Sequence, residues 1–385
     1  MIFRILEDQF ASKSKQSKEA DQRFMQLALV LGRRGQGRTW PNPAVGAVVV
    51  KDGVIVGRGW TQAGGRPHAE PVALAHAGEA ARGATLYVTL EPCSHFGKSP
   101  PCVDAIIATG IARVVSAIED PNPEVAGQGH AKLRAAGIKV DIGLGAREAA
   151  HDHAGHFRRV RDKRPHVILK LAVSADDKIA AAGHKTMAIT GEAAKARVHL
   201  LRAQCDAILV GIGTVLADDP LLTCRLPGME ARSPVRVVLD RALRIPGSSK
   251  LVHSARETPL WVMTSSLSEA PATVKLGAAG AQVIRVATTS APPPGLDLTA
   301  VLHALAGKGI TRLLVEGGAT IATALLRADL VDRLCWFHAP SVIGGDGLPA
   351  LTAMGLDVPA QAPRFARLAL ETVGEDVLET LGRAA

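Results

Sequence analysis

One histidine, one glutamate and two cysteines stand in an order that suits catalysis at a metal ion. His68 and Glu70 are separated by one residue, and Cys93 and Cys102 follow with eight residues between them. One imidazole and two thiolates suit a borderline-soft ion such as Zn²⁺ and leave a fourth tetrahedral position open. Glu70 is not needed as a ligand, so its carboxylate can carry protons between water and a substrate. We therefore predict zinc ligands at His68, Cys93 and Cys102 and a catalytic role for Glu70.

Other interpretations of these residues stay open. His68 alone fits a surface or buried structural histidine, and the two cysteines alone fit buried apolar positions or a disulfide. A closed structural zinc site would need a fourth protein ligand, for which His95 is the nearest candidate. Removal of the metal distinguishes a structural zinc site from a catalytic one, because a zinc-stabilised scaffold unfolds without its ion. A catalytic site loses activity but largely keeps its fold.

Composition limits the remaining function classes. A length of 385 residues favours two domains. The net charge of +9 suits an anionic ligand. The basic residues are scattered and aromatic residues make up only 3% of the chain, which disfavours general nucleic-acid binding. The odd count of five cysteines, the absence of a signal-like N-terminus and the lack of a long apolar run predict a cytoplasmic protein with no membrane partner.

Strands alternate with helices along most of the chain, which predicts layered α/β domains. We expect an N-terminal extension over residues 1–20, a first domain over 21–163 and a second over 164–385. Helices are expected at Arg23 to Leu31 and at Glu70 to Ala81, and another begins at Pro101. The basic run from Phe157 to Arg164 fits a nucleic-acid patch, but we interpret it as a solvated helix end or linker.

Glycine-rich turns follow two strands of the second domain. Gly317 and Gly318 lead into a helix, where backbone N–H groups can hold a phosphate. Many α/β turns need glycine only for the turn itself, so this remains open. Gly211 and Gly213 also follow a strand, but Leu216 stands where a dinucleotide fingerprint needs a small residue.

Seven segments together resemble one known family, the bifunctional deaminase/reductase of riboflavin biosynthesis. The eight-residue spacer between the cysteines is distinctive, because most deaminases of this superfamily have two residues there. The resemblance covers residues 21–385 and rests on segments 39–46, 67–70, 89–102, 120–129, 200–204, 214–223 and 315–318.

The resemblance implies a cytidine-deaminase-like three-layer α/β/α domain followed by a dihydrofolate-reductase-like α/β domain. The first would bind one Zn²⁺ through His68, Cys93 and Cys102, with Glu70 as the proton carrier, and would deaminate a phosphorylated diaminopyrimidine ribosylamine. The second would reduce the ribosyl carbon with NADPH to give the ribitylamino product. The partner would be a phosphorylated small molecule, not a nucleic acid, and we expect a homo-oligomer.

The resemblance also assigns residues to ligands. The cofactor positions are Ala172, Ala188, Thr214, Asp218, Arg241, Gly318, Ala319, Thr320, Ile321, Ala322, Thr323 and Ala324. The substrate positions in the second domain are Thr186, Arg202, Leu222, Arg225 and Glu316. In the first domain we assign Asn42, and also His95 and Lys98, which lie in the polar spacer beside the metal ligands.

Three positions depart from the family pattern. Asp177 replaces a glycine, Ala188 replaces a bulky residue, and Arg241 replaces a small serine. All three fall near the expected cofactor site and bear on the choice between NADPH and NADH. One rival remains, an RNA-editing base deaminase with an appended domain, and salt-dependent tRNA binding would support it.

Overall fold

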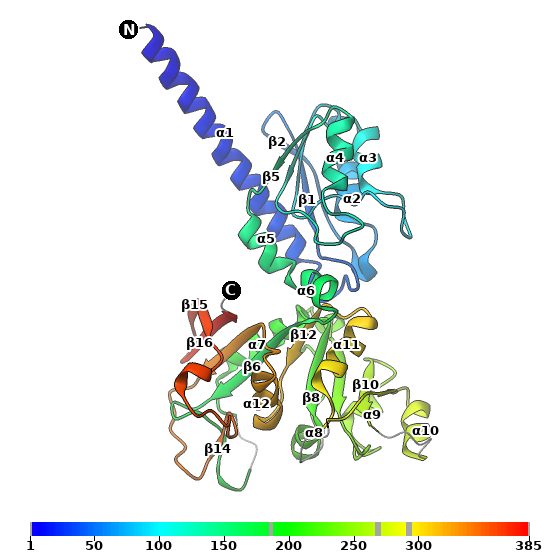
Figure 1. Cartoon of the computed structure of the whole chain (residues 1–385), viewed down its shortest axis with the longest axis vertical. Coiled ribbons are helices and arrows are strands. Elements are labelled where there is room, and N and C mark those ends of the chain that lie inside the picture. Colours follow the sequence, from blue (N-terminus) through cyan, green and yellow to red (C-terminus); the bar gives the residue numbers. More distant parts are fainter. Residues whose placement is uncertain (1, 185–187, 266–270, 290–294, 384–385) are drawn as a thin grey trace. The chain divides into compact units, whose positions relative to one another are not determined.

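A strand with two buried faces organises the N-terminal part of the chain. In β1 (Gly46–Lys51), Ala47 and Val49 pack with the helix Ala69–Ala77 (α2), whereas Val48 and Val50 pack with the helix Ile2–Arg33 (α1). Because side chains alternate along a strand, two buried faces require helices on both sides of the sheet. The result is the three-layer α/β/α arrangement that the sequence predicts (Figure 1).

The computed structural model describes residues 2–184, 188–265, 271–289 and 295–383. The chain divides into two compact units, Met1–Asp162 and Lys163–Ala385. Besides α1, β1 and α2, unit 1 contains β2 (Val54–Trp60), η1 (Ala63–Gly65), η2 (Gly78–Ala81), β3 (Thr85–Val88), α3 (Cys102–Ala108), β4 (Arg113–Ser116), α4 (Gln128–Ala135), β5 (Lys139–Ile142), α5 (Ala146–Asp152) and α6 (Ala154–Asp162).

The five strands of unit 1 lie in the order β2-β1-β3-β4-β5. The hairpin β1–β2 is antiparallel, and β3, β4 and β5 are parallel. Helix α1 begins at Ile2, well before the helix start expected at Arg23. Residues 2–20 contain no proline or glycine, so nothing in the local sequence ends the helix there.

Two glycines bring α2 close to the sheet. A Cβ atom added at Gly57 would lie 2.1 Å from the carbonyl oxygen of Ala73, and one at Gly59 would lie 2.3 Å from that of Ala69. Only glycine permits this separation between the strand and the helix backbone. The close packing fixes the start of α2, the helix that begins directly after His68.

Unit 2 is built on a mostly parallel sheet. Its elements are β6 (His166–Val173), β7 (Lys178–Ala180), η3 (Ala182–His184), α7 (Glu192–Ala203), β8 (Ala207–Gly211), α8 (Ile212–Asp218), η4 (Glu230–Arg232), β9 (Val235–Leu239), α9 (Lys250–His253), β10 (Leu260–Thr264), α10 (Pro271–Ala278), β11 (Gln282–Arg285), α11 (Leu298–Gly307), β12 (Arg312–Val315), α12 (Ala319–Arg327), β13 (Arg333–His338), β14 (Leu348–Pro349), η5 (Pro359–Gln361), β15 (Phe365–Val373) and β16 (Asp376–Arg383).

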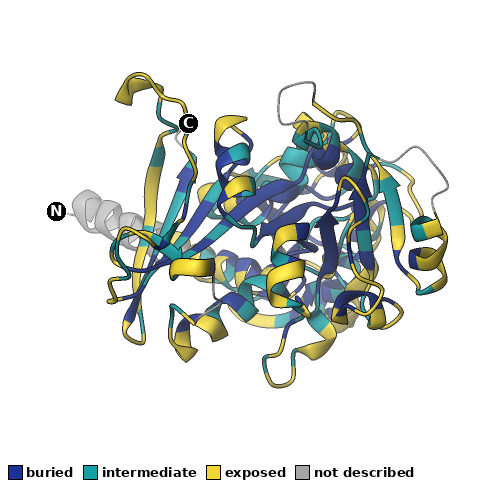
Figure 2. Cartoon of the chain, turned by 90° about the horizontal axis from the view of Figure 1, so that it is seen from below, coloured by how far each residue is buried: buried dark blue, intermediate teal, exposed yellow. Residues whose placement is uncertain are grey.

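The nine-stranded sheet has the order β11-β10-β9-β8-β12-β6-β13-β16-β15. Strands from β11 to β13 are parallel, and β16 and β15 form an antiparallel hairpin at one edge. The central strands are buried, while helices and loops carry exposed residues on their outer sides (Figure 2). This matches the α/β architecture expected for the second domain.

The basic segment around α6 makes contacts within the chain. Arg158 pairs with Asp162, and the Arg161 guanidinium lies over the Phe157 ring, 5.4 Å from the ring centre. Arg164 forms a bidentate ion pair with the buried Asp332. These contacts favour the helix-end interpretation over a nucleic-acid patch. Within the described ranges, no helix has both the length and the apolar character needed to cross a membrane.

Candidate functional site

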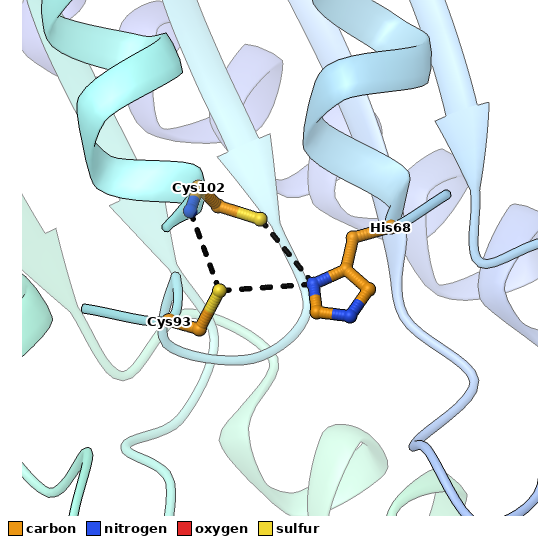
Figure 3. Close-up of side chains that lie close together, drawn as sticks. All are labelled: His68, Cys93 and Cys102. Carbon is orange, nitrogen blue, oxygen red and sulfur yellow. Dashed lines mark hydrogen bonds between the residues drawn. The ribbon is translucent and has the colours of Figure 1, made fainter. Parts of the chain in front are cut away.

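Three potential metal ligands come from separate segments of unit 1 and meet at one point. His68 is the residue before α2, Cys93 lies in the loop after β3, and Cys102 is the first residue of α3. The Nδ1 atom of His68 lies 3.7 Å from the Cys93 sulfur and 3.4 Å from the Cys102 sulfur. Figure 3 shows this ring nitrogen facing both sulfur atoms.

The separations fit a zinc ion. Bond lengths of about 2.0 Å to nitrogen and about 2.3 Å to sulfur place these two donors about 3.5 Å apart in a tetrahedral site. The ligand atoms of His68, Cys93 and Cys102 all lie within 4.8 Å of one another, and His95 does not belong to this group. Among the described residues the group therefore supplies three ligands, as an open catalytic site requires.

The local hydrogen bonds stabilise the thiolate form of Cys93. The Cys102 side chain, together with His68 and the backbone N–H of Cys102, lowers the pKa of Cys93 to about 4. The proximity of Cys93 and burial raise the pKa of Cys102 well above its usual range. The hydrogen bond with Cys93 also raises the pKa of His68. The negative charge is thus favoured at Cys93, while the protonated forms are favoured at Cys102 and His68, and a metal ion must displace those protons.

Glu70 lies in the first turn of α2 and is buried, with 3% of its surface exposed. Burial, with the nearby Cys93 thiolate, raises its pKa to about 7. A carboxyl group with that pKa gains and loses a proton near neutral pH, which suits general acid–base catalysis. The structure therefore brings Glu70 beside the ligand group that the sequence predicts, in an environment suited to proton transfer.

Polar side chains surround the ligand group. The Asn42 amide lies 3.2 Å from Nε2 of His68 and donates to the carbonyl of Gly65. Arg66, which the sequence analysis did not single out, lies 3.3 Å from the same ring nitrogen and donates to the Ser99 hydroxyl at 3.0 Å.

The spacer residues differ in exposure. His95 is half-buried, and its Nδ1 atom has no hydrogen-bond partner among the described residues. Lys98 is exposed. An unpartnered buried nitrogen and an exposed cation in the loop between the two cysteines can both serve a polar, anionic ligand.

The predicted cofactor residues of unit 2 follow the carboxyl ends of neighbouring parallel strands. Ala172 lies in β6, Thr214 and Asp218 lie in α8 after β8, and Arg241 follows β9. Gly318 and the residues to Ala324 begin α12 after β12. In the order β9-β8-β12-β6 these ends share one edge of the sheet, which is where parallel α/β sheets bind ligands.

A buried ion pair lies at the same edge. Arg202 in α7 donates to both carboxylate oxygens of Glu316, at 2.7 and 2.9 Å, and to the carbonyl of Thr223 at 3.0 Å. Burial opposes ionisation of Glu316, but the Arg202 charge and hydrogen bond outweigh it and lower the pKa. Arg202 therefore fixes both Glu316 and the segment that carries Leu222 and Arg225.

Lys170 in β6 is a further residue of this site that the sequence analysis missed. Burial lowers its pKa, and Glu316 is the nearby charge that opposes this shift. Its ammonium group lies 5.9 Å from the centre of the Phe337 ring. The only sequence signal was a lysine within an apolar strand, His166–Val173, where a charge must have a partner.

The departures from the family pattern have different structural settings. Asp177 has a φ of 60°, the left-handed region that glycine adopts most easily, which explains why glycine is usual there. Ala188 and Arg241 are exposed. Thr186 lies outside the described residues. Leu222 is buried with a φ of 55°, and Arg225 is exposed.

Two family models match the chain. The model of the RibD C-terminal domain matches residues 165–378, and that of the cytidine and deoxycytidylate deaminase zinc-binding region matches residues 18–118. The second match includes His68, Glu70, Cys93 and Cys102. The matches support a zinc-binding deaminase domain followed by an NADPH-dependent reductase domain.

Relatives are similar over nearly the whole chain. The riboflavin biosynthesis protein RibD of Aquifex aeolicus is 42% identical, covering 94% of this chain and 98% of its own length. That of Escherichia coli is 43% identical, covering 93% and 98%. The structure of Acinetobacter baumannii RibD has a TM-score of 0.85 at 36% identity, covering 96% of this chain and 100% of that chain.

A Thermotoga maritima structure is similar to the same extent. It is the structure of a diaminohydroxyphosphoribosylaminopyrimidine deaminase/5-amino-6-(5-phosphoribosylamino)uracil reductase, with a TM-score of 0.82 at 35% identity. It covers 96% of this chain and 100% of that chain. Similarity over both units argues against the RNA-editing alternative, which explains only the first unit.

Replacing Cys93 by alanine should remove zinc, because two remaining donors cannot complete the ligand set. Cys205→Ala is the matched control, since Cys205 is buried in unit 2 and belongs to no described ligand group. Metal analysis of protein never exposed to chelator should find one zinc per chain in the control and almost none in Cys93→Ala. Equal zinc in both variants would rule out Cys93 as a ligand.

Zinc binding should release protons at neutral pH. The pKa values of His68 and Cys102 are raised in the metal-free protein, so both groups favour their protonated forms, whereas the ion binds their deprotonated forms. The affinity for zinc should therefore rise as the pH rises through and above the ordinary histidine value of 6.5. Competition with a chelator of known pH dependence measures this, and a pH-independent affinity would contradict the assignment of these protons.

Proposed function

The chain belongs to the RibD family of riboflavin-biosynthesis deaminase/reductases, and from this we propose how its residues divide the two reactions between its units. It is a bifunctional enzyme that uses Zn²⁺ for deamination and NADPH for reduction. We propose that unit 1 deaminates the diaminohydroxyphosphoribosylaminopyrimidine and that unit 2 reduces 5-amino-6-(5-phosphoribosylamino)uracil, the reactions in the name of the Thermotoga relative. The observation that carries the proposal is the three-donor group with buried Glu70 beside it.

In unit 1, His68, Cys93 and Cys102 would hold the zinc ion. Zn²⁺, when bound with an open position, acts as a Lewis acid and lowers the pKa of water there. Glu70 takes the proton that the attacking water loses and returns it to the departing amino group. One residue can perform both transfers because a carboxyl group both accepts and donates a proton, and Glu70 is buried in a fixed position in the first turn of α2.

The polar residues around the ligand group would bind the pyrimidine and its phosphate. Asn42 offers a hydrogen-bonding group beside His68, and the loop between Cys93 and Cys102 carries the unpartnered Nδ1 atom of His95 and the exposed charge of Lys98. A cation on a polar loop stabilises a phosphate ester by charge. The spacer Ser94 to Pro101 is thereby assigned to substrate recognition.

In unit 2, the strand ends at one sheet edge would bind NADPH, which supplies the hydride. Gly318 opens α12, so the first N–H groups of that helix face a negatively charged cofactor group favourably. Thr214 and Asp218 would add polar contacts from α8, and Ala172 and Ala188 would leave space for the cofactor. Thr320 and Ile321 lie in the same first turn of α12.

The buried charges near Glu316 would bind the sugar that is reduced. Arg202 holds Glu316 in place, and Lys170 is a second, half-buried cation near Glu316 with a lowered pKa. A lysine in that state can donate a proton to an oxygen of the substrate while the hydride reduces the carbon. Arg225 is the exposed cation that we assign to the phosphate, with Leu222 and Thr186 as further substrate contacts.

We place the reaction in the cytoplasm, where reducing conditions keep metal-binding thiolates available. The substrate is a small molecule. A homo-oligomer is supported by the exposed Leu368 and Leu370 on β15, the edge strand of the large sheet.

Glu70→Gln should abolish deamination and spare reduction. Glutamine keeps the shape but cannot carry a proton, and general acid–base catalysis is worth about 10²–10⁴-fold. The variant should retain zinc and still reduce the deaminated ribosylamine phosphate at the normal rate. Glu79→Gln, which changes an exposed glutamate of the same unit, should behave as wild type. Loss of both activities in a folded, zinc-loaded variant would mean that the two sites are not independent.

Lys98→Ala should raise the KM of the deaminase for its phosphorylated substrate and leave kcat nearly unchanged. The lost group is a charge for binding rather than for the chemical step. Lys139→Ala removes another exposed lysine of unit 1 and should leave KM unchanged. Steady-state kinetics checks both variants, and an unchanged KM for Lys98→Ala would indicate that the spacer is only a solvated connection.

Arg241→Ser should weaken NADPH binding more than NADH binding. Arg241 follows β9 at the proposed cofactor edge, where its charge can pair with the 2′-phosphate. Arg244→Ser is the control, because it removes an exposed arginine from the same loop. Fluorescence titration gives the dissociation constants of NADPH and NADH for each variant. Equal weakening of both cofactors by Arg241→Ser would show that Arg241 does not discriminate between them.

A further inference from the structure

A buried carboxylate lies two residues before the ligand Cys93. The Glu91 side chain has 0% exposure, and its oxygens accept four backbone hydrogen bonds of 2.9–3.3 Å. The donors all lie in one segment, residues 120–130, that leads into and begins α4. They are the N–H groups of Asp120, Gly127, Gly129 and His130.

These hydrogen bonds account for the burial of the Glu91 carboxylate, and no second metal ion is needed to stabilise it. Glu91, Glu119 and His130 have possible ligand atoms within 4.8 Å of one another. However, four N–H groups already direct their positive ends at the Glu91 oxygens, and such an arrangement binds anions. A cation at Glu91 would face those same positive ends. The Glu91 carboxylate therefore serves as an anion bound by the protein's own backbone.

The segment 120–132 also contacts the chain on both sides of Cys93. A Cβ atom added at Gly129 would lie 2.1 Å from the carbonyl oxygen of Pro92, so the two backbones are in close contact. On the other side, the Lys132 ammonium donates to the carbonyl of Ser94 at 2.7 Å. Residues 91, 92 and 94 are thus all held by residues 120–132, and Cys93 lies between the attachment points.

We propose that Glu91 is a positioning residue that holds the Cys93 sulfur at ligand distance from zinc, using residues 120–132 as its anchor. The proposal rests on the ligand set assigned above. Glu91 does not contact the metal group itself. Hydrogen bonds to a charged acceptor are stronger than those to a neutral one, so the charge of Glu91 matters as well as its shape.

Zinc release from the full chain tests this role. Glu91→Gln keeps the side-chain size but turns amide hydrogens toward backbone donors, and Glu91→Asp keeps the charge but shortens the reach. Asp21→Asn is the matched control, because Asp21 is a carboxylate of the same unit that binds Tyr87 and Arg113 and not the Cys93 loop. Reductase activity on the deaminated substrate reports the integrity of unit 2 in each variant.

We expect zinc to transfer to a chromogenic chelator about 10- to 100-fold faster from Glu91→Gln, because loss of a residue that supports a metal ligand typically lowers metal affinity by that factor and a weaker site releases its ion faster. Glu91→Asp should be intermediate, and Asp21→Asn should match wild type. With Co²⁺ in place of zinc, the thiolate charge-transfer band should change in both Glu91 variants and not in Asp21→Asn.

Release at the wild-type rate from the Glu91 variants, or equally fast release from Asp21→Asn, would overturn the positioning role. If Glu91→Gln does not yield folded protein, Glu91→Asp decides alone. Failure of wild-type protein to hold zinc would instead overturn the ligand set, so the two outcomes are distinguishable.

Discussion

Unit 1 depends on keeping one nitrogen and two sulfur atoms about 3.5 Å apart although their residues come from three segments. His68 and Cys102 stand at the starts of two helices, so their positions follow from how α2 and α3 pack on the sheet. Gly57 and Gly59 set the depth of α2, because any side chain there would push the helix outward. Cys93 does not begin a helix. It lies in a loop in which residues 91, 92 and 94 contact the segment 120–132.

In unit 2, the parallel sheet itself positions the residues of the candidate site. A parallel sheet places several strand ends along one edge, and the loops after β6, β8, β9 and β12 meet there. At this edge lie a largely buried arginine and glutamate and a half-buried lysine. Burying charges costs free energy unless they are paired, so Arg202 and Glu316 constrain each other tightly. The candidate site of unit 1 thus consists of an imidazole and two thiol ligands, whereas that of unit 2 consists of charged side chains.

The sequence was a good guide where chemistry forces a spacing or an alternation. His68, Glu70, Cys93 and Cys102 could be read directly, and so could the alternation of strands with helices, because buried parallel strands are continuous apolar runs. The hairpin β15–β16 was missed, since β15 is half exposed and lacks such a run. Glu91 and Lys170 were also missed. Their roles arise from contacts with residues distant in sequence, and no local pattern records those contacts.

Both units must act in turn on one molecule if the division of labour is correct. The direct test is to give purified full-length protein the diaminopyrimidine ribosylamine phosphate, with and without NADPH, and to identify the products by mass spectrometry. Without NADPH, the product should have lost its amino group in exchange for oxygen and kept the ribosyl chain. With NADPH, it should also have gained two hydrogens on that chain. A product reduced but not deaminated, or no product with zinc-loaded enzyme, would contradict the assignment.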